Sequence, residues 1–418
     1  MLSDQAEPKA TPKTPLLSIP DALALMHGAI TPIADVDFVA LADAAGRVLA
    51  AHAYADVDQP AFDRSMMDGV AVRSADCAAA GAIIHVVGQA PAGAPWHGVV
   101  GQGQGVRVMT GGIVPPGANA VVPVERIAAV DDADTVRIEE VVIAEQHIAR
   151  TGSEVRRGAI VVRAGSRLDG ERLGVLAAFG VARPSVARRP RVGILPTGDE
   201  IVPAESIPGP GQVRDSNRWS LAALASSWGA EVVHEAVAAD RKEAIGDAIG
   251  RIVDLVDVIV LSGGVSMGDY DHVASALARR GATTVFHRVK LRPGKPVLCA
   301  RLGDTLVLGL PGNPVSSVVA AHLFLRPAIA ALAGVSAPRW CRLSVDLVGD
   351  LPANGMRDAM LAARWCQGPH GLAVTPLQTA GSADLAAFAH GQVMIAQNAK
   401  APAQSTGDRV DVLVWVEG

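Results

Sequence analysis

The chain has 418 residues, half of them apolar and 19% charged, so it is long enough for two to four globular domains. This balance excludes a disordered scaffold. The formal net charge of −5 excludes a general affinity for the phosphates of nucleic acid, although it allows a local basic pocket.

The first 16 residues combine acids and prolines without an apolar core, which predicts a disordered tail rather than a signal peptide. The four cysteines form no CxxC pair and lack metal-finger spacing, which favours a reducing compartment. The longest apolar stretch begins at Val315 and contains His322, Arg326 and Pro327, so we expect a buried helix rather than a membrane span. The expected location is the cytoplasm, with neither a membrane nor a nucleic acid as partner.

Two short helices and a β-rich region are expected in the first part of the chain. Ser18 precedes Ile-Pro-Asp and regularly spaced apolar residues, which is typical of a capped helix. A second helix is expected from Val39 to Val48. Between Asp56 and Arg150, short β-type runs alternate with glycine and proline clusters, which predicts a compact β-rich insert.

Between Arg191 and Gly334, apolar runs alternate with segments of helical spacing, the pattern of a doubly wound α/β sheet. The expected strands are RVGILPT, AEVVHEAV, DVIVLSGG, TTVFHRVK and TLVLGLPG, and the expected helices lie near 217–228, 241–255, 272–280 and 315–333. After Pro338, alternation of apolar and polar residues predicts a small β barrel or sandwich.

The predicted fold class is therefore α/β and multidomain, with a central doubly wound α/β domain, a β-rich insert, a small mixed linker domain and a C-terminal β barrel. We expect a tail at 1–16, the linker domain at 17–55 and 151–188, the insert at 56–150, the α/β domain at 189–336 and the barrel at 337–418.

Glycine-rich polar loops follow four of the predicted α/β strands. Because the carboxyl ends of parallel strands meet at one edge of a sheet, we expect these loops to form one ligand site. Glycines let backbone N–H groups approach a ligand, and N–H groups before a helix attract anions. Two of the loops therefore suit a phosphate or another oxyanion, and they contain Gly263, Gly264 and Ser266, and Gly312, Asn313 and Ser316.

Cations and acids accompany these loops. Alternation along an extended segment, expected to include a strand at 284–291, places four cations on one face, and these are Arg288, Lys290, Arg292 and Lys295. The acids offer hard oxygen ligands for Mg²⁺, and they are Asp199, Glu200, Asp240, Asp269 and Asp271. Together these groups indicate a phosphorylated substrate with a metal.

Simpler interpretations stay open for each signal. The cations can belong to a solvated edge strand, and Asp240 and Ser316 can cap helices. Convergence of four such loops at one edge favours the ligand site. An ordinary P-loop is excluded, because Lys295 is followed by Pro296 instead of a hydroxyl residue.

Seven segments, in this order, resemble the molybdopterin molybdenumtransferase (MoeA) family: SMMDGVAV, RVMTGGIVPPGANAVVPVE, GILPTGDEIV, GQVRDSN, LSGGVSMGDYD, VKLRPGKP and LGLPGNPVSS. The resemblance covers about residues 17–418 and is shared with the C-terminal domain of gephyrin. It implies a transferase that inserts molybdate into adenylylated molybdopterin, with Mg²⁺-dependent release of AMP, to form the molybdenum cofactor. It also implies a homodimer, supplied with its small-molecule substrate by a molybdopterin adenylyltransferase.

The resemblance assigns roles to individual residues. The implied catalytic residues are Asp271, Glu200, Asp240, Asp68 and Thr110, of which Glu200, Asp240 and Asp271 also hold the metal. Asp68 and Thr110 belong to the insert, which in the family reaches across the homodimer. The implied substrate-binding residues are Gly263, Gly264, Ser266, Asp269, Arg288, Arg292, Lys295, Pro311, Gly312, Asn313, Pro314, Ser316, Arg357 and Ser382.

Two other functions remain as alternatives. A molybdopterin adenylyltransferase has a related α/β domain with similar glycine loops, but the β insert and the C-terminal barrel favour the molybdenumtransferase. A pterin-binding scaffold without turnover is the second alternative, and the presence of Asp68, Thr110 and Asp271 counts against it.

Overall fold

The computed structural model describes residues 16–235, 237–264, 272–336 and 338–417. The described chain forms two compact units. One unit contains the residues up to Ala51, Ala164–Asp169 and the residues from Ser185 onward, and the other contains His52–Arg163 and Gly170–Pro184. The finer division into a linker domain, an insert, an α/β domain and a barrel stays a prediction.

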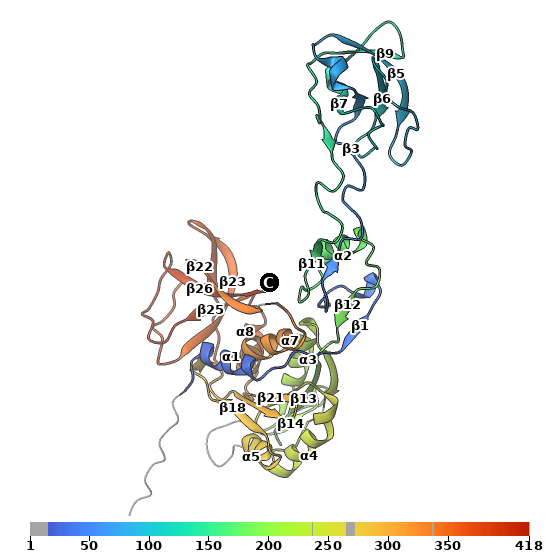
Figure 1. Ribbon diagram of the computed structural model, residues 1–418. Helices are drawn as coiled ribbons and strands as arrows, with labels where there is room; N and C mark the ends of the chain where they lie inside the picture. The colour runs from blue at the N-terminus through green and yellow to red at the C-terminus, as the bar shows by residue number, and fades with distance from the viewer. Residues whose placement is uncertain (1–15, 236, 265–271, 337, 418) are drawn as a thin grey trace, which may run out of the picture. The chain divides into compact units, whose positions relative to one another are not determined.

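A six-stranded sheet organises the α/β part of the first unit (Figure 1). Its strands are ordered β16 (Glu231–Glu235), β13 (Arg191–Pro196), β17 (Val258–Ser262), β21 (Thr305–Leu310), β20 (Leu298–Leu302) and β18 (Thr283–His287). The first four strands are parallel, and β20 is antiparallel to both of its neighbours. Strand β18 therefore runs in the same direction as β21, and the two end at the same edge.

Helices cover both faces of this sheet. One face packs against α1 (Ile19–Gly28), α3 (Asn217–Ser227) and the continuous helix Pro314–Leu332. The other face packs against α4 (Lys242–Ile252) and α5 (His272–Arg279). The central strands are buried along almost their whole length and are mostly apolar, as expected where both faces of a sheet are covered, which confirms the doubly wound arrangement.

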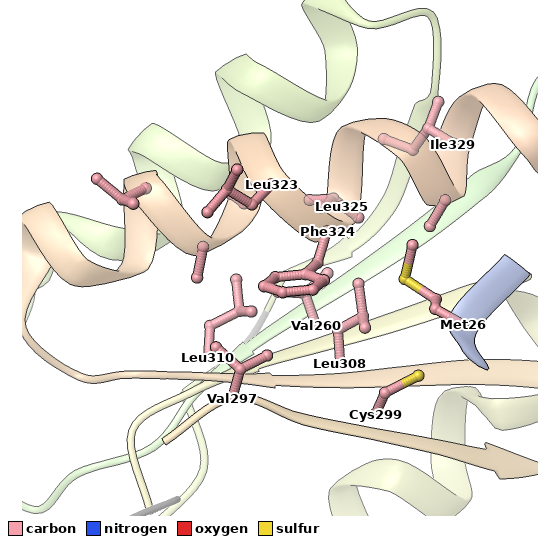
Figure 2. Packing of buried hydrophobic residues seen from close by; sticks show 14 of the residues in the cluster. Met26, Val260, Val297, Cys299, Leu308, Leu310, Leu323, Phe324, Leu325 and Ile329 are labelled. Atoms are coloured by element: carbon pink, nitrogen blue, oxygen red, sulfur yellow. The ribbon is translucent and has the colours of Figure 1, made fainter. Parts of the chain in front are cut away.

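The long helix consists of α6 (Pro314–Ala320), the π-helical turn η5 (Ala321–Leu325) and α7 (Arg326–Leu332). Its length and apolar composition would be enough to cross a membrane, but 83% of its apolar window is buried inside the protein. Figure 2 shows Phe324 pointing from this helix toward the sheet, near Val260 and Leu308. Full burial of such a side chain contributes about 1.5–3 kcal/mol. The expected buried helix is confirmed.

The C-terminal strands form a second sheet. Its order is β19 (Leu291–Arg292), β23 (Asp358–Gly368), β24 (Gly371–Pro376), β22 (Arg339–Leu347), β26 (Arg409–Val416) and β25 (Val393–Gln397). A further pairing between β25 and β23 closes five of these strands into the expected barrel. The short helix α8 (Leu385–Phe388) lies between β24 and β25 in the chain. Strand β19 comes from the segment between β18 and β20, so that segment extends into the barrel sheet.

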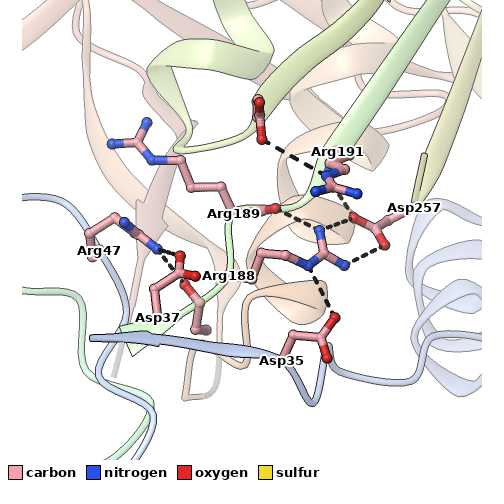
Figure 3. Close-up of polar contacts among 9 residues, drawn as sticks. Asp35, Asp37, Arg47, Arg188, Arg189, Arg191 and Asp257 are labelled. Carbon is pink, nitrogen blue, oxygen red and sulfur yellow. Dashed lines mark hydrogen bonds and ion pairs between the residues drawn. The ribbon is translucent and has the colours of Figure 1, made fainter. Parts of the chain in front are cut away.

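A small ladder of β1 (Val36–Phe38) and β12 (Ser185–Ala187) precedes the α/β sheet. Directly after β12, Arg188 donates from both terminal nitrogens to Asp257 at 3.0 Å, and from Nε to Asp35 at 3.3 Å (Figure 3). Asp257 also accepts a hydrogen bond from the backbone N–H of Arg191 at 2.7 Å. Arg188 thus ties the ladder to the start of β13, and hydrogen bonding to Asp257 raises the pKa of the guanidinium.

The second unit is rich in β structure, as expected. Its main sheet is ordered β7 (Ala120–Pro123), β4 (Gly69–Val72), β6 (Gln104–Val108), β5 (Ala82–Ala90), β9 (Thr135–Ile138) and β8 (Ile127–Ala129). Separate apolar clusters cover its faces, one around Val70 and Ile84 and the other around Ala71 and Val106. The remaining elements are β3 (Arg64–Ser65) with β10 (Ile148–Ala149), β2 (Ala53–Tyr54) with β11 (Ile160–Val162), and α2 (Gly170–Ala178).

The prediction of a helix from Val39 to Val48 is wrong. Only a single 3₁₀ turn forms there, at Leu41–Asp43. Gly46 adopts a φ of 73°, in the left-handed region, and the chain then forms a bridge between Val48 and Arg167. Tertiary pairing therefore replaces the local helical pattern.

The prediction of a strand over residues 284–291 is wrong in its extent. Strand β18 ends at His287, and Arg288 has a φ of 73°, a left-handed conformation in which a strand cannot continue. The expected alternation of four cations along one strand face is therefore interrupted at its first member.

Candidate active site

An open cleft of about 1210 Å³ lies where β13, β17 and β21 end. Its other wall comes from the barrel, including Leu361 and Thr379. The expected site residues that line it are Glu200, Asp240, Gly263, Gly264, Arg292, Lys295, Pro311, Gly312, Asn313, Pro314, Ser316, Arg357 and Ser382. Residues that are distant in the sequence thus meet at one end of the α/β sheet.

A group of carboxylates forms one side of the cleft. The backbone N–H of Asp240 donates to Asp199 Oδ1 at 3.2 Å. Burial raises the pKa of Asp240; His272 opposes this shift, whereas Asp199 and Glu200 add to it. Asp240 Oδ1 is buried and has no hydrogen-bond partner among the described residues. An unpartnered carboxylate oxygen beside other carboxylates suits a hard divalent cation.

The chemistry of this donor set fits Mg²⁺, which commonly takes one or two protein carboxylates together with substrate phosphates. In the part of the chain that the structure describes, no group of three or more His, Cys, Asp or Glu residues is arranged to hold a metal. Glu200 and Asp240 both line the cleft. The third expected ligand, Asp271, lies outside the described residues, as do Ser266 and Asp269.

Two glycine loops form the floor of the cleft. Gly263 and Gly264 have φ values of 100° and 61°, which L side chains rarely adopt. A Cβ on Gly263 would lie 2.4 Å from the carbonyl oxygen of Thr197. A Cβ on Gly312 would lie 3.5 Å from the Cα of Gly263, so the loops after β17 and β21 are in contact. A side chain at Gly263 would therefore collide with the backbone of Thr197.

Cations form a further part of the lining. Arg292 and Lys295 line the cleft, whereas Arg288 and the exposed Lys290 are not among its lining residues. Arg357 Nη1 donates to the carbonyl oxygen of Leu291 at 3.1 Å and thereby ties β19 to the barrel. The pairing of β19 with β23 places Arg292 at the cleft. A contribution from Arg288 to the site stays a prediction.

Ser382 connects the barrel wall to the start of the long helix. Its Oγ accepts a hydrogen bond from Asn313 Nδ2 at 2.9 Å, and its carbonyl oxygen accepts one from the backbone N–H of Val315 at 3.1 Å. One N–H at the helix start is therefore already used within the protein. An anion at this position therefore cannot use the N–H of Val315.

Known proteins are similar to this chain in both sequence and fold. Residues 17–180 match the family model described as the MoeA N-terminal region (domain I and II), and residues 193–331 match a probable molybdopterin binding domain. A molybdopterin molybdenumtransferase from Nostoc sp. is 33% identical over 335 residues, which cover 78% of this chain and 76% of the relative. The chain belongs to the molybdopterin molybdenumtransferase family.

Other members of the molybdopterin molybdenumtransferase family agree with this assignment. The molybdopterin molybdenumtransferase of Bacillus subtilis is 34% identical over 301 residues, covering 71% of this chain and 70% of the relative. A solved structure of a molybdopterin biosynthesis moeA protein from Pyrococcus horikoshii OT3 has a TM-score of 0.83 and 26% identity, covering 96% of this chain and 100% of that chain. As a member of this family, the chain is a transferase of molybdenum cofactor biosynthesis.

Two residues that the family resemblance implicates, Asp68 and Thr110, lie together in the second unit. Thr110 donates to Asp68 Oδ1 from its backbone N–H at 2.6 Å and from Oγ1 at 2.9 Å. These two hydrogen bonds, the backbone one first, lower the pKa of Asp68. Asp68 borders a hollow of about 440 Å³ that Arg107 and Val124 also line. The carboxylate is thus held ionised, and its catalytic role stays a prediction.

Thr197 and Asn217 are two of the polar cleft residues that were not assigned to the site from the sequence of this family member. Thr197 Oγ1 and Asn217 Oδ1 are buried and have no hydrogen-bond partner among the described residues, and both residues line the cleft. Asn217 belongs to GQVRDSN, a segment that carries the family resemblance. Its position in that segment is the signal that points to it, since a lone Asn before a helix otherwise indicates capping.

Proposed function

We propose that this chain inserts molybdate into the dithiolene of adenylylated molybdopterin and releases AMP, with Mg²⁺ as the assisting metal. One observation carries the proposal: carboxylates, cations and two glycine loops line a single cleft. This combination suits an adenylylated substrate together with an oxyanion. Cations attract the oxyanion, carboxylates hold the metal, and backbone N–H groups accommodate phosphate oxygens.

Arg292 and Lys295 bind oxygen atoms of molybdate or phosphate through charge-assisted hydrogen bonds. Such bonds are stronger than neutral ones, and the planar guanidinium of Arg292 can engage two oxygens at once. Their positive charge, already present in the cleft, stabilises negative charge that develops during the reaction. No covalent intermediate with the protein is needed.

Glu200 and Asp240 would hold Mg²⁺, together with Asp271, which lies outside the described residues. The metal would neutralise phosphate charge while the adenylyl group leaves. Asp240 presents its unpartnered Oδ1 for this purpose. Asp68 and Thr110 act on the same substrate from the partner subunit of a homodimer. The substrate comes from a molybdopterin adenylyltransferase, and the reaction takes place in the cytoplasm.

The test is a turnover assay in which purified protein receives adenylylated molybdopterin, Mg²⁺ and molybdate, while AMP and molybdenum cofactor are measured. The variant Arg292→Ala is expected to raise the molybdate concentration needed for half-maximal rate about tenfold or more, since a hydrogen bond to a charged group contributes about 1.5–3 kcal/mol. Lys290→Ala is the matched control, because that nearby cation is exposed and does not line the cleft.

Release of AMP without metal insertion would identify a different activity for the cleft. Absence of both AMP release and cofactor formation in the wild-type protein would contradict the proposed function. An equal effect of Lys290→Ala and Arg292→Ala would show that general surface charge, rather than a ligand position, sets the molybdate requirement.

A further inference from the structure

The carboxamide of Asn217 joins the two glycine loops of the cleft. Asn217 begins α3, and its Nδ2 donates to Ser262 Oγ and to the carbonyl oxygen of Gly312, each at 2.7 Å. Ser262 ends β17, and Gly312 lies in the loop after β21. One nitrogen therefore spans the two loops that meet at Gly263 and Gly312.

The start of α3 is itself held firmly. The buried carboxylate of Asp215 accepts a hydrogen bond from the backbone N–H of Arg218 at 3.0 Å. The backbone N–H of Asp215 donates to the carbonyl oxygen of Val202 at 2.9 Å, next to the short ladder of β14 (Ile201–Val202) and β15 (Val213–Arg214). Asn217 is thus presented from a fixed helix end.

The carbonyl groups of the loop after β21 are turned toward these side chains. Gly312 O accepts from Asn217, and Ser262 Oγ donates to Pro311 O at 3.4 Å. In a trans peptide the C=O and the following N–H point in opposite directions. The N–H groups of Gly312 and Asn313 therefore point away from Asn217 and Ser262. Neither has an acceptor among the described residues, and both residues line the cleft.

The other end of the same carboxamide indicates that stability alone does not explain this residue. Asn217 Oδ1 is buried without a hydrogen-bond partner among the described residues. A buried, unsatisfied acceptor opposes folding. The amide cannot be turned around to relieve it, because the Gly312 carbonyl accepts hydrogen bonds and would then face another acceptor.

We infer that Asn217 is a positioning residue that orients the N–H groups of Gly312 and Asn313 toward a phosphate group of the substrate. Two successive N–H groups that point the same way form an anion site in which the protein supplies no net charge. This inference rests on the proposed function, which gives the cleft an adenylylated substrate. It assigns to Asn217 the recognition of the phosphate rather than of the base or the ribose.

The experiment compares binding of AMP and of adenosine by titration calorimetry, with the full-length wild-type chain and Asn217→Ala. The preference of the wild type for AMP is expected to fall about tenfold or more in the variant, while the Kd for adenosine and the Tm change little. Asn217→Asp, which keeps the shape and loses the N–H donors, is expected to lose the preference as well. Ser220→Ala, on the same helix and outside the cleft lining, is the control.

The possible results separate this inference from the proposed function. Equal weakening of AMP and adenosine, an unchanged preference in Asn217→Ala, or no preference in the wild type would each overturn the inference. If the wild type turns over its substrates and the preference is unchanged, the positioning role fails and the proposed function stands. If turnover is absent but the preference falls as expected, the phosphate site stands and the proposed function fails.

Discussion

Four buried polar atoms of the cleft lining have no hydrogen-bond partner among the described residues. One of them, Asp215 Oδ2, forms an ion pair with Arg218 at 3.4 Å, and the other three belong to Thr197, Asn217 and Asp240. A buried polar group left unsatisfied costs about 1–3 kcal/mol, so folded proteins usually pair such groups. Three of them in the lining of one cleft indicate that these side chains are placed for a ligand rather than for stability. Each one is therefore a position where substitution should separate activity from folding.

Asp240→Asn tests this separation. The variant is expected to lose activity about 100-fold or more and to lose its response to Mg²⁺, because an amide is a much poorer ligand for a hard cation. Burial raises the pKa of Asp240, so the folded state disfavours the charged form. Removing the charge should consequently leave the Tm at pH 7 unchanged or higher. Turnover at several Mg²⁺ concentrations and thermal unfolding provide the measurements.

Asp254→Asn is the control for this substitution, since that carboxylate is exposed and lies outside the cleft lining. Full activity of Asp240→Asn with an unchanged Mg²⁺ response would remove Asp240 from the metal site. A large drop in Tm would instead show that the carboxylate supports the fold.

At the scale of elements, the strands and helices of the α/β part could be predicted because each leaves a local pattern. Apolar runs identified β13, β17 and β21, and the direction of parallel strands correctly predicted that their ends meet. The path after β18 could not be predicted, since it depends on the pairing of Leu291 with Asp358 in the barrel. No local pattern records a contact between segments so far apart.

Contacts between distant segments also could not be predicted within the candidate site. Glycine loops, acids and cations could be located from their positions after strands. The hydrogen bonds from Asn217 to Ser262 and Gly312 span 45 and 95 residues of sequence, so only the folded chain reveals them. The sequence thus predicted which loops form the cleft, and the structure adds which side chain holds two of them together.

The π-helical turn of the long helix contains a partly buried histidine, His322, whose protonation should weaken the fold. The ring of His322 packs against Trp228 at 5.1 Å between centroids, and Trp340 donates from Nε1 to its carbonyl oxygen. Burial, with a smaller contribution from Arg326, lowers the pKa of His322 to about 4. In the unfolded chain the imidazole has its ordinary pKa of about 6.5, so it binds a proton more readily there than in the folded protein. The contribution of neutral His322 to the free energy of unfolding is therefore fully present above about pH 6.5 and is lost as the pH falls toward 4.

This loss should reach about 3 kcal/mol between pH 6.5 and 4, from the difference between the two pKa values. Urea unfolding, followed by tryptophan fluorescence at pH 7 and at pH 4.5, measures it. The variant His322→Leu is expected to show a shallower dependence on pH over this interval. His390→Gln is the control, because His390 is exposed. Identical pH dependence of wild type and His322→Leu would assign acid sensitivity to other groups.

For the whole molecule, the two compact units carry different parts of the expected chemistry. The first unit contains the cleft with Asp240 and Arg292, and the second contains Asp68 and Thr110. In a homodimer with a shared active site, each cleft would take its Asp68 from the partner subunit. A twofold axis would create two such sites for each dimer. Loss of activity in one chain can then be repaired by the other.

Mixing Asp68→Ala chains with Asp240→Asn chains tests this arrangement. Each variant alone is expected to be inactive, whereas an equal mixture refolded or co-expressed together should regain about a quarter of wild-type activity. That fraction follows because random pairing makes half of the dimers mixed, and each mixed dimer contains one intact and one doubly altered site. Light scattering must first show that the protein is a dimer. Mixed dimers without activity would place both carboxylates of a site on one chain, and a monomer would exclude sharing.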